Sequence, residues 1–348
     1  MDIDRVAVIH MQNGRGIGTG LAIVATAALL SAVLIIVLRP LLARYAVARP
    51  NARSSHEIPT PQGGGIAVIA ATIAVSGSVL LFSTAASPLP LTLVFAGVLL
   101  IAAVGVVADK HPVDVVPRLV LQTFAIVAVL FALPPGLRLL PVLPWWCERI
   151  ALVIGGLWFV NLVNFMDGLD WMTVAEVIPI TAALAAIGFL GILPWQDIVL
   201  SLALCGAMVG FAFFNRPIAT LFLGDVGSLP IGLLLGWLLL LLAGSGARTA
   251  AILLPLYYLA DSTITLLRRA LNGEKVWQAH RSHYYQRATD RGFSVTEVVT
   301  CVFVLNLALG SLAVVTVLLP SKLTEVSAVL CGVVLVGWLL VTFARGKR

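Results

Sequence analysis

The chain has 348 residues, of which 60% are hydrophobic and only 11% are charged, so it is far more apolar than a water-soluble protein of this length. A formal net charge of +6 is compatible with nucleic-acid binding, but the basic residues are scattered over short connectors between apolar runs and form no stripe. We therefore expect no nucleic-acid partner, because a lipid bilayer and anionic substrates explain the charge better.

The elements expected from this composition are membrane-spanning helices. Apolar runs of roughly 17 to 25 residues have the length of a helix that crosses a bilayer, and they lack the alternation of a membrane β-barrel. The predicted fold class is all-α, a single integral membrane domain over residues 1–348 built as a polytopic bundle of about 11 helices with its termini on opposite faces. The runs lie at about 18–38, 65–83, 91–108, 118–134, 149–165, 174–194, 198–214, 228–244, 249–267, 295–318 and 323–343.

The charges on the connectors predict the orientation of the bundle. One face holds 16 of the 22 Lys and Arg, and the positive-inside rule makes it the cytoplasmic face. About 11 of the 16 carboxylates lie on or near the same face, so we expect the active site there. The opposite face holds the other six basic residues, which are Arg5, Arg15, Arg138, Arg149, Arg248 and Lys322.

The first polar connector, RPNARSSHEIPTPQGGGIAV at residues 49–68, is rich in Pro and Gly. Pro59 and Pro61 stiffen it, and the three glycines at 63–65 let its backbone approach another group closely. That group is either a ligand or a neighbouring helix. An ordinary loop followed by a glycine-rich helix start is equally compatible with the pattern.

Two carboxylates lie at the ends of predicted spans. Asp109 follows the third run, where a carboxylate is either a solvated helix end or a group that handles protons or a cation near an anionic substrate. Asp225 lies between Gly224 and Gly227 before a long apolar run. There it can hold Mg²⁺ against phosphate oxygens, or it can simply cap the helix.

A third polar cluster lies in the segment WFVNLVNFMDGLDW. Spacings of three residues put Asn161, Asn164 and Asp167 on one helical face, and Asp170 follows after Gly168. Amides and carboxylates placed in this way can share a metal or a ligand, although polar residues also form hydrogen bonds between membrane helices. Four such groups within ten residues favour a site.

The longest polar segment, ADSTITLLRRALNGEKVWQAHRSHYYQRATDRGFS, combines arginines with two histidines. Arg281 offers forked donors to phosphate, and the imidazoles of His280 and His283 can donate hydrogen bonds or bind a cation. The HxxH spacing also resembles a zinc pair, but no third His or Cys accompanies it, so phosphate contact is the favoured interpretation. A positive-inside loop would explain the arginines but not both histidines.

Taken in order over about residues 50–293, these motifs resemble the polyprenyl-phosphate N-acetylhexosamine-1-phosphate transferase family, glycosyltransferase family 4. The family also contains the phospho-N-acetylmuramoyl-pentapeptide transferases, and the AHRSHYYQR form is closer to its polysaccharide-initiating branch. The resemblance implies an enzyme dependent on Mg²⁺, with Mn²⁺ as an alternative. In the implied reaction, polyprenyl (undecaprenyl) phosphate attacks the β-phosphate of a UDP-N-acetylhexosamine such as UDP-GlcNAc, and UMP is released.

The resemblance also implies a location and roles for single residues. We expect a multi-pass protein of the bacterial inner (cytoplasmic) membrane that initiates a cell-surface polysaccharide such as lipopolysaccharide in cell wall biogenesis, and a homodimer is compatible with this. By analogy Asp225 would be the principal Mg²⁺ ligand, with Asn164 assisting. The catalytic residues would be Asp109, Asp167, Asp225, His280 and His283, and the substrate-binding residues Asn161, Asn164, Gly168, Asp170, Phe222 and Arg281.

Three positions depart from the pattern of the family. Ala108 stands where the family has the first of two paired aspartates, Trp171 stands where it usually has Gly, and Gln62 replaces a common Arg. The missing carboxylate keeps a second hypothesis open, an impaired relative that binds polyprenyl phosphate or nucleotide-sugar. A lipid or ion transporter is a third, and it predicts polar residues that continue to the far face.

Overall fold

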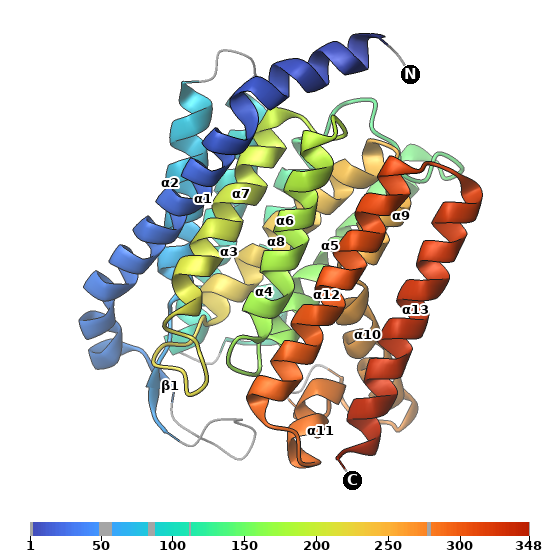
Figure 1. Cartoon of the computed structure of the whole chain (residues 1–348). Coiled ribbons are helices and arrows are strands. Elements are labelled where there is room, and N and C mark those ends of the chain that lie inside the picture. The colour runs from blue at the N-terminus through green and yellow to red at the C-terminus, as the bar shows by residue number, and fades with distance from the viewer. Residues whose placement is uncertain (1–2, 49–57, 83–87, 111–112, 277–279, 348) are drawn as a thin grey trace.

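The computed structural model describes residues 3–48, 58–82, 88–110, 113–276, 280–347 of the chain. This part forms a bundle of helices that run roughly side by side, with the N-terminal and C-terminal ends at opposite ends of the bundle (Figure 1). The predictions of an all-α fold and of termini on opposite faces are confirmed. The first part of the Pro- and Gly-rich connector, residues 49–57, lies outside the described residues.

The helices and strands follow the apolar runs closely. In chain order the elements of the described residues are α1 Ile3–Tyr45, β1 Val47–Ala48, β2 Thr60–Pro61, α2 Gly65–Leu81, α3 Pro88–Lys110, α4 Val115–Phe131, α5 Trp145–Met166, α6 Met172–Phe189, α7 Trp195–Ala212, α8 Asp225–Gly244, α9 Arg248–Leu253, α10 Leu256–Leu271, α11 Tyr284–Asp290, α12 Val295–Leu318 and α13 Lys322–Arg345.

Eight helices of the described residues are long and apolar enough to cross a membrane by length and composition, and α2 and α4 are shorter apolar helices. These ten correspond to ten of the predicted spans. The prediction of a continuous ninth span over 249–267 is wrong, because Leu254 and Pro255 separate α9 from α10. Proline lacks the backbone N–H that a continuous helix requires, and its ring clashes with the preceding turn.

The face of α10 that packs against the protein is polar, and its exposed face is apolar. Its buried face carries polar groups, including Asp261 and Thr265, whereas Ile264, Leu267 and Leu271 are exposed. In a membrane bundle an apolar exposed face contacts lipid, and polar groups turn inward to find partners. The residues of α10 therefore bring hydrogen-bonding groups into the protein at one end of the bundle.

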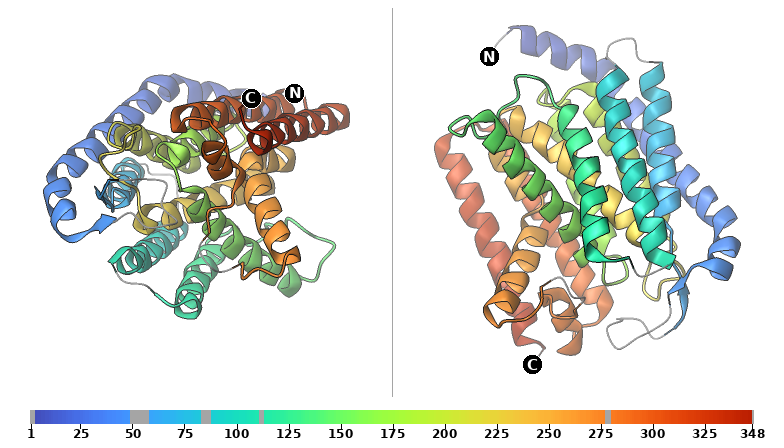
Figure 2. Two further views of the ribbon diagram at one scale, coloured as in Figure 1. Left: turned by 90° about the horizontal axis from the view of Figure 1, so that it is seen from below. Right: turned by 180° about the vertical axis from the view of Figure 1, so that it is seen from behind.

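Small residues let the outer helices pack closely. α1 runs obliquely across the outside of the bundle and lies against α7 (Figure 1). A Cβ atom added at Gly206 or Gly210 of α7 would lie 2.3 and 2.2 Å from backbone oxygens of α1, so this contact requires glycine. On the other side, α3, α4 and α5 lie next to one another in chain order (Figure 2).

α8 is the central helix, and its N-terminus is where three parts of the chain meet. It contacts α2, α3 and α5. A Cβ atom added at Gly65 would lie 2.2 Å from the Cα of Gly227, and one added at Gly105 would lie 2.4 Å from the backbone nitrogen of Val226. These glycines bring α2 and α3 into contact with the first turn of α8. Asp225 is the first residue of α8, whereas the sequence analysis placed it just before this helix.

Candidate active site

The Pro- and Gly-rich connector forms one wall of the site through backbone hydrogen bonds. β1 and β2 pair antiparallel, and the backbone N–H groups of Gly63 and Gly64 donate to the carbonyl oxygen of Phe222 at 3.1 and 2.9 Å. The backbone N–H of Phe222 donates to Pro61 in turn, at 2.9 Å. The glycines therefore let this connector lie close to the backbone of Phe222, and their hydrogen bonds hold Phe222 in place.

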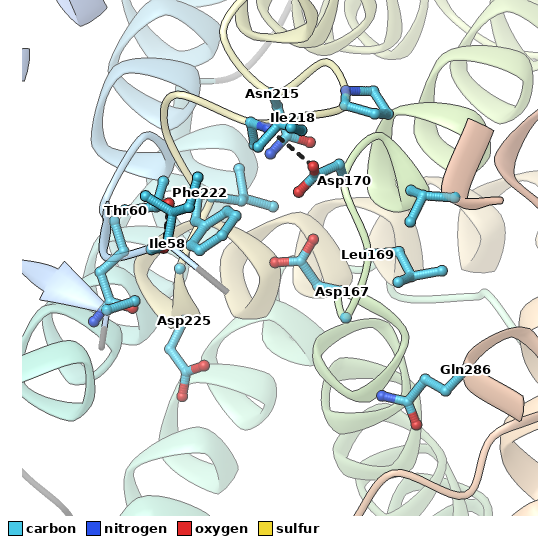
Figure 3. Close-up of a pocket in the computed structure, with 18 of the residues that line it drawn as sticks. Ile58, Thr60, Asp167, Leu169, Asp170, Asn215, Ile218, Phe222, Asp225 and Gln286 are labelled. Atoms are coloured by element: carbon cyan, nitrogen blue, oxygen red, sulfur yellow. Dashed lines mark hydrogen bonds between the residues drawn. The ribbon is translucent and has the colours of Figure 1, made fainter. Parts of the chain in front are cut away.

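A cavity of about 670 Å³ opens beside this wall, at the end of the bundle where β1 and α11 lie (Figures 1 and 3). Asp167 and Asp170 point into it from the loop after α5, and Phe222 lies across from them (Figure 3). The polar residues of its described lining are Thr60, Gln62, Asp109, Asn164, Asp167, Asp170, Asn215, Asp225, Gln286 and Thr296.

Arg118 of α4 joins the predicted metal ligands. Its guanidinium donates to a carboxylate oxygen of Asp225 at 3.3 Å and to the amide oxygen of Asn164 at 3.1 Å. A third, longer bond of 3.4 Å reaches the amide oxygen of Asn161. Asn164 also donates to Asp225 at 2.7 Å and to Ser228 at 2.8 Å. Oxygen acceptors from α5 and α8 thus converge on one cationic group.

This arrangement is compatible with Mg²⁺. Carboxylate and amide oxygens are ligands of Mg²⁺, which usually takes one or two carboxylates and completes its shell with water and substrate phosphates. The guanidinium of Arg118 stands in for such a cation, because it contacts both Asp225 and Asn164. Within the described part of the chain, no three His, Cys, Asp or Glu residues form a cluster that could hold a metal. A metal bound here would take its remaining ligands from water and substrate phosphates.

Asp109 has a structural task in addition to its place in the cavity wall. Its two carboxylate oxygens accept the backbone N–H groups of Asp225 at 2.9 Å and Val226 at 3.2 Å. A carboxylate at this position satisfies unpaired donors of the first turn of α8 and interacts favourably with the helix dipole. Gln62, which replaces a common Arg, donates to the backbone oxygen of Asp109 at 2.6 Å. Ala108 is not among the described lining residues.

Asp167 is a half-buried carboxyl group that lines the cavity among other carboxylates. It is the residue that follows the last turn of α5, and the hydroxyl of Thr173 donates to it at 2.5 Å. Burial, together with the negative charges of Asp225, Asp109 and Asp170, raises its pKa to about 7. A carboxyl group with this pKa is partly ionised at neutral pH, which is compatible with the predicted catalytic role.

The loop between α5 and α6 is fixed by a residue that departs from the family pattern. Trp171 has a positive φ of 63°, a conformation that Gly adopts most easily. Its indole N–H donates to the backbone oxygen of Ala212 at 2.7 Å, and its backbone N–H donates to Asn215 at 2.8 Å. Asp170 accepts the backbone N–H of Ala219 at 2.9 Å. The tryptophan thus ties this loop to the segment after α7, and its ring is held outside the described lining of the cavity.

Asp261 of α10 organises the histidine segment. It is fully buried and accepts the backbone N–H groups of Tyr284 and Tyr285 at 3.0 and 3.1 Å. Its Oδ1 also lies 3.2 Å from Nδ1 of His283. The other ring nitrogen of His283, Nε2, is buried and has no hydrogen-bond partner among the described residues. Asp261 therefore fixes the orientation of this imidazole.

The other two residues of the predicted phosphate-binding group have separate partners. His280 stacks on His283 with ring centroids 4.8 Å apart, and burial together with the positive charges of His283 and Arg269 lowers its pKa to about 4. It is therefore neutral at pH 7. Arg281 forms a 3.1 Å ion pair with Asp290. The described lining of the cavity contains none of the three residues His280, Arg281 and His283.

The structure thus brings only part of the predicted site into the cavity wall. Asn161 exchanges hydrogen bonds with Gln122 and is not among the described lining residues. The roles predicted for it and for the histidine segment stay predictions. The predicted residues that line the cavity are Asp109, Asn164, Asp167, Gly168, Asp170, Phe222 and Asp225.

The sequence interpretation missed three residues of the site. Arg118 lies near the start of an apolar helix, where a charged side chain needs a partner, and this was the signal for it. Asp261 lies inside the predicted ninth span, and the same signal applied to it. Gln286, which lines the cavity beside Gly168, had no signal of its own in the sequence. Its place is set by α11, which packs so closely that a Cβ atom at Gly168 would lie 2.2 Å from the hydroxyl oxygen of Tyr285.

Comparisons with known proteins agree with the motifs. Residues 91–243 match the model of the family described as glycosyl transferase family 4. The chain is 25% identical to a probable undecaprenyl-phosphate N-acetylglucosaminyl 1-phosphate transferase of Bacillus subtilis, over 84% of each chain. It is 28% identical to a decaprenyl-phosphate N-acetylglucosaminephosphotransferase of Mycolicibacterium smegmatis, over 74% of this chain and 72% of the relative. A phospho-N-acetylmuramoyl-pentapeptide-transferase of Heliobacterium modesticaldum is 29% identical over 48% of this chain and 54% of its own.

Proposed function

We propose that this chain, whose residues 91–243 match the model of glycosyl transferase family 4, transfers N-acetylhexosamine 1-phosphate from a UDP-sugar to polyprenyl phosphate and releases UMP. One observation carries the proposal. Oxygen acceptors of Asp225, Asn164 and Asn161 converge on a single cationic group beside a cavity of about 670 Å³. Nucleotide diphosphates and a bridging cation require this kind of site.

The protein belongs in a membrane, and its acceptor substrate is a lipid. We propose the bacterial inner membrane, with the cavity at the cytoplasmic face where UDP-sugars are available. The excess of Lys and Arg on this side of the bundle supports the orientation. The product would then be a lipid-linked sugar that starts a cell-surface polysaccharide.

The walls of the cavity suggest how the donor binds. Phe222, fixed by the Pro- and Gly-rich connector, offers a ring on which uracil stacks. Asp170 is held by the backbone N–H of Ala219, and its carboxylate accepts a further hydrogen bond from the uracil edge. The diphosphate then lies toward Arg118, Asn164 and Asp225. This places the β-phosphate at the end of the cavity nearest α4 and α5.

Asp225 and Asn164 are the residues that would hold Mg²⁺, and the bound ion would neutralise the phosphate oxygens and orient them for attack. Arg118 has a second task in this arrangement. When its present partner Asp225 is taken up as a metal ligand, the guanidinium is available to the phosphate groups, to which it can donate two parallel hydrogen bonds.

The reaction is a substitution at phosphorus. An oxygen of polyprenyl phosphate forms a bond to the β-phosphorus, the bond from that phosphorus to the bridging oxygen breaks, and UMP leaves with the electron pair. Asp167, whose pKa is raised to about 7, accepts the proton of a singly ionised polyprenyl phosphate. The protein otherwise contributes positioning and charge compensation, which dominate phosphoryl transfer.

The test is release of UMP from radiolabelled UDP-GlcNAc by the purified full-length protein with undecaprenyl phosphate, with Mg²⁺ and after chelation. We expect a lipid-linked sugar that depends on Mg²⁺ and disappears in Asp225→Ala. Glu325→Gln is the matched control, because it removes a carboxylate of α13 that pairs with Lys322 at the opposite end of the bundle. Product formation by Asp225→Ala at the wild-type rate would overturn the assignment of Asp225.

A second candidate is an impaired relative that binds a nucleotide-sugar or polyprenyl phosphate without turnover. The observation that favours it is that position 108 carries no carboxylate and Asp109 is committed to the first turn of α8. The two candidates differ in one measurement. If the wild type binds UDP-GlcNAc and releases no UMP, whereas Ala108→Asp releases it, the second candidate holds. If the wild type is active and Ala108→Asp changes nothing, the enzyme does not need the paired carboxylate.

A further inference from the structure

A second cavity lies at the other end of the bundle, between α4 and α5. Its volume is about 530 Å³. α5 runs from Trp145 at this end to Asn161 and Asn164 at the active site. With a rise of 1.5 Å per residue, Arg149 lies about 18 Å from Asn161 along the helix, so the two cavities belong to opposite halves of the membrane. Its described lining has eleven residues, among them Trp145, Arg149 and Ile154 of α5.

One lining residue is charged, and it has no carboxylate partner among the described residues. Arg149 donates through Nη2 to the backbone oxygen of Leu137 at 3.1 Å, and its guanidinium lies 5.5 Å from the ring centroid of Trp145. Its Nη1 is shielded from water and has no hydrogen-bond partner in the part of the chain that the structure describes. Burying a guanidinium N–H without a hydrogen-bond acceptor costs free energy. The apolar cavity therefore contains an unused cationic donor.

The neighbouring charges do not satisfy this donor. Glu148, the carboxylate next in sequence, is fully buried and forms an ion pair with Arg138. It also accepts the backbone N–H groups of Leu139 and Leu140 at 2.6 and 3.1 Å. Glu148 is therefore committed to closing the turn before α5, and Arg149, which lines the cavity, forms no ion pair with a described carboxylate.

We propose that this cavity binds an anionic phospholipid of the leaflet opposite the active site. An acyl chain would lie in the apolar groove between α4 and α5, and the phosphate would accept hydrogen bonds from the guanidinium of Arg149. Trp145 and Trp146, both exposed at the start of α5, mark the level of the lipid headgroups. The site is separate from the proposed transferase reaction and does not depend on it.

The lining argues for a lipid and against a soluble anion. Ten of its eleven residues are apolar or aromatic, so a free phosphate would gain one contact and lose most of its hydration. A phospholipid brings its own apolar chain, whose burial supplies the remaining affinity. Because α4 also carries Arg118 and α5 carries Asn164, a lipid held between them would stabilise the two helices that build the active site.

The experiment is native mass spectrometry of the full-length protein after removal of co-purified lipid. Phosphatidylglycerol and phosphatidylcholine with identical acyl chains are titrated separately, and inorganic phosphate is added in a third arm. We expect phosphatidylglycerol to bind at least tenfold more tightly than phosphatidylcholine. In Arg149→Gln this preference should disappear, and inorganic phosphate should not displace the lipid. Arg248→Gln is the matched control, because Arg248 is an exposed arginine at the same end outside the described lining.

A second variant tests the groove without changing the charge. Ile154 is 62% exposed, so Ile154→Trp adds bulk to the wall without disturbing the interior. Ile154→Trp should weaken the binding of both lipids about equally and leave the ratio of their dissociation constants unchanged. The proposal is overturned if Arg149→Gln, shown to be folded by its melting curve, keeps the preference for phosphatidylglycerol. It is also overturned if phosphate displaces the lipid, or if a dimer of the wild type dissociates in Arg149→Gln, which would identify a second copy of the chain as the occupant.

Discussion

Two carboxylates at the same end of the bundle show how differently one chemical group can be used. Asp225 forms its side-chain bonds with Arg118 and Asn164, and it lines the cavity with part of its carboxylate exposed. Asp261 is fully buried and is fixed by two backbone N–H groups and an imidazole. Partners that are long side chains can be exchanged for a ligand, whereas backbone partners cannot. Asp225 is thus suited to binding and Asp261 to holding a segment in place.

The largest effect is expected at the exchangeable carboxylate. Asp225→Asn keeps the size of the side chain and removes the charge that a cation needs, so we expect turnover to fall about a thousandfold or more. The melting temperature should change little, because the partners of Asp225 reach solvent or one another. UMP release and a melting curve measured on the same preparation check both expectations.

The comparison would break if the melting temperature of Asp225→Asn fell as far as its activity, since Asp225 would then be a structural residue like Asp261. Ser228→Ala serves as the neighbouring control. It removes a hydroxyl that accepts from Asn164 at 2.8 Å but takes no charge away from the site. We expect it to retain most of the wild-type turnover.

The second effect is expected at the fixed carboxylate. Asp261→Asn replaces one acceptor oxygen with an amide group, so a backbone N–H of Tyr284 or Tyr285 loses its partner. A buried donor left unsatisfied costs about 1–3 kcal/mol. We expect a clear decrease in melting temperature and a loss of activity of about a hundredfold, because His283 and α11 lose their orientation.

Asp290→Asn is the control for Asp261→Asn. It removes a half-exposed carboxylate at the end of α11 that pairs with Arg281, which precedes this helix. If both variants lose stability and activity to the same extent, the histidine segment depends on its total charge and not on the buried acceptor. If only Asp261→Asn does so, the contrast between the exchangeable and the fixed carboxylate is sharpened.

The same contrast explains what could be predicted from the sequence. Asn164 and Asp167 are three residues apart, so local periodicity was sufficient to group them. Asp225 joined this group only through the resemblance to the family. Ten of the eleven predicted spans correspond to apolar helices for the same reason, since length and hydropathy are local properties. The broken span at Pro255 was missed because its residues remain apolar enough on average to be taken as one helix.

Contacts over a long distance in sequence could not be predicted in this way. Arg118 meets Asp225 across 107 residues, and Asp109 meets the same turn across 116 residues. The second contact turns a predicted catalytic carboxylate into one that also caps α8. The unused donor of Arg149 is also invisible in the sequence, because it depends on Glu148 being taken by Arg138. Pairing of buried charges is decided by packing, and packing is a property of the whole bundle.

A third effect concerns the pH dependence of the reaction. The pKa of Asp167 is raised to about 7 by burial and by neighbouring carboxylates, and its ionised form is the one that accepts a proton. The ionised fraction rises from about one-tenth at pH 6 to about nine-tenths at pH 8. We expect kcat/KM for UDP-GlcNAc to rise about tenfold over this interval, with a midpoint near pH 7.

Asp167→Asn separates this ionisation from that of the lipid phosphate. The variant retains the titration of the substrate but not that of the side chain, so the rise in kcat/KM should become shallower. An unchanged profile in Asp167→Asn would show that Asp167 takes no part in the proton transfer. His280, whose pKa of about 4 keeps it neutral over the whole interval, should not contribute to the profile.

The smallest effect comes from the hydroxyl that supports Asp167. Thr173 donates to its carboxylate at 2.5 Å, and a hydrogen bond to the ionised form lowers the pKa of the acid. Thr173→Val removes this bond, so the pKa of Asp167 should rise further and the midpoint of the profile should move to higher pH. At pH 7 the ionised fraction, and with it kcat/KM, should fall about threefold, whereas at pH 9 the two proteins should be nearly equal in kcat/KM.

Thr181→Val is the control for Thr173→Val, because the hydroxyl of Thr181 donates to the backbone oxygen of Val177 in the same helix. A loss of activity in Thr173→Val that is independent of pH would mean that the hydroxyl acts through packing, and Asp167 would then belong with Asp261 among the fixed carboxylates.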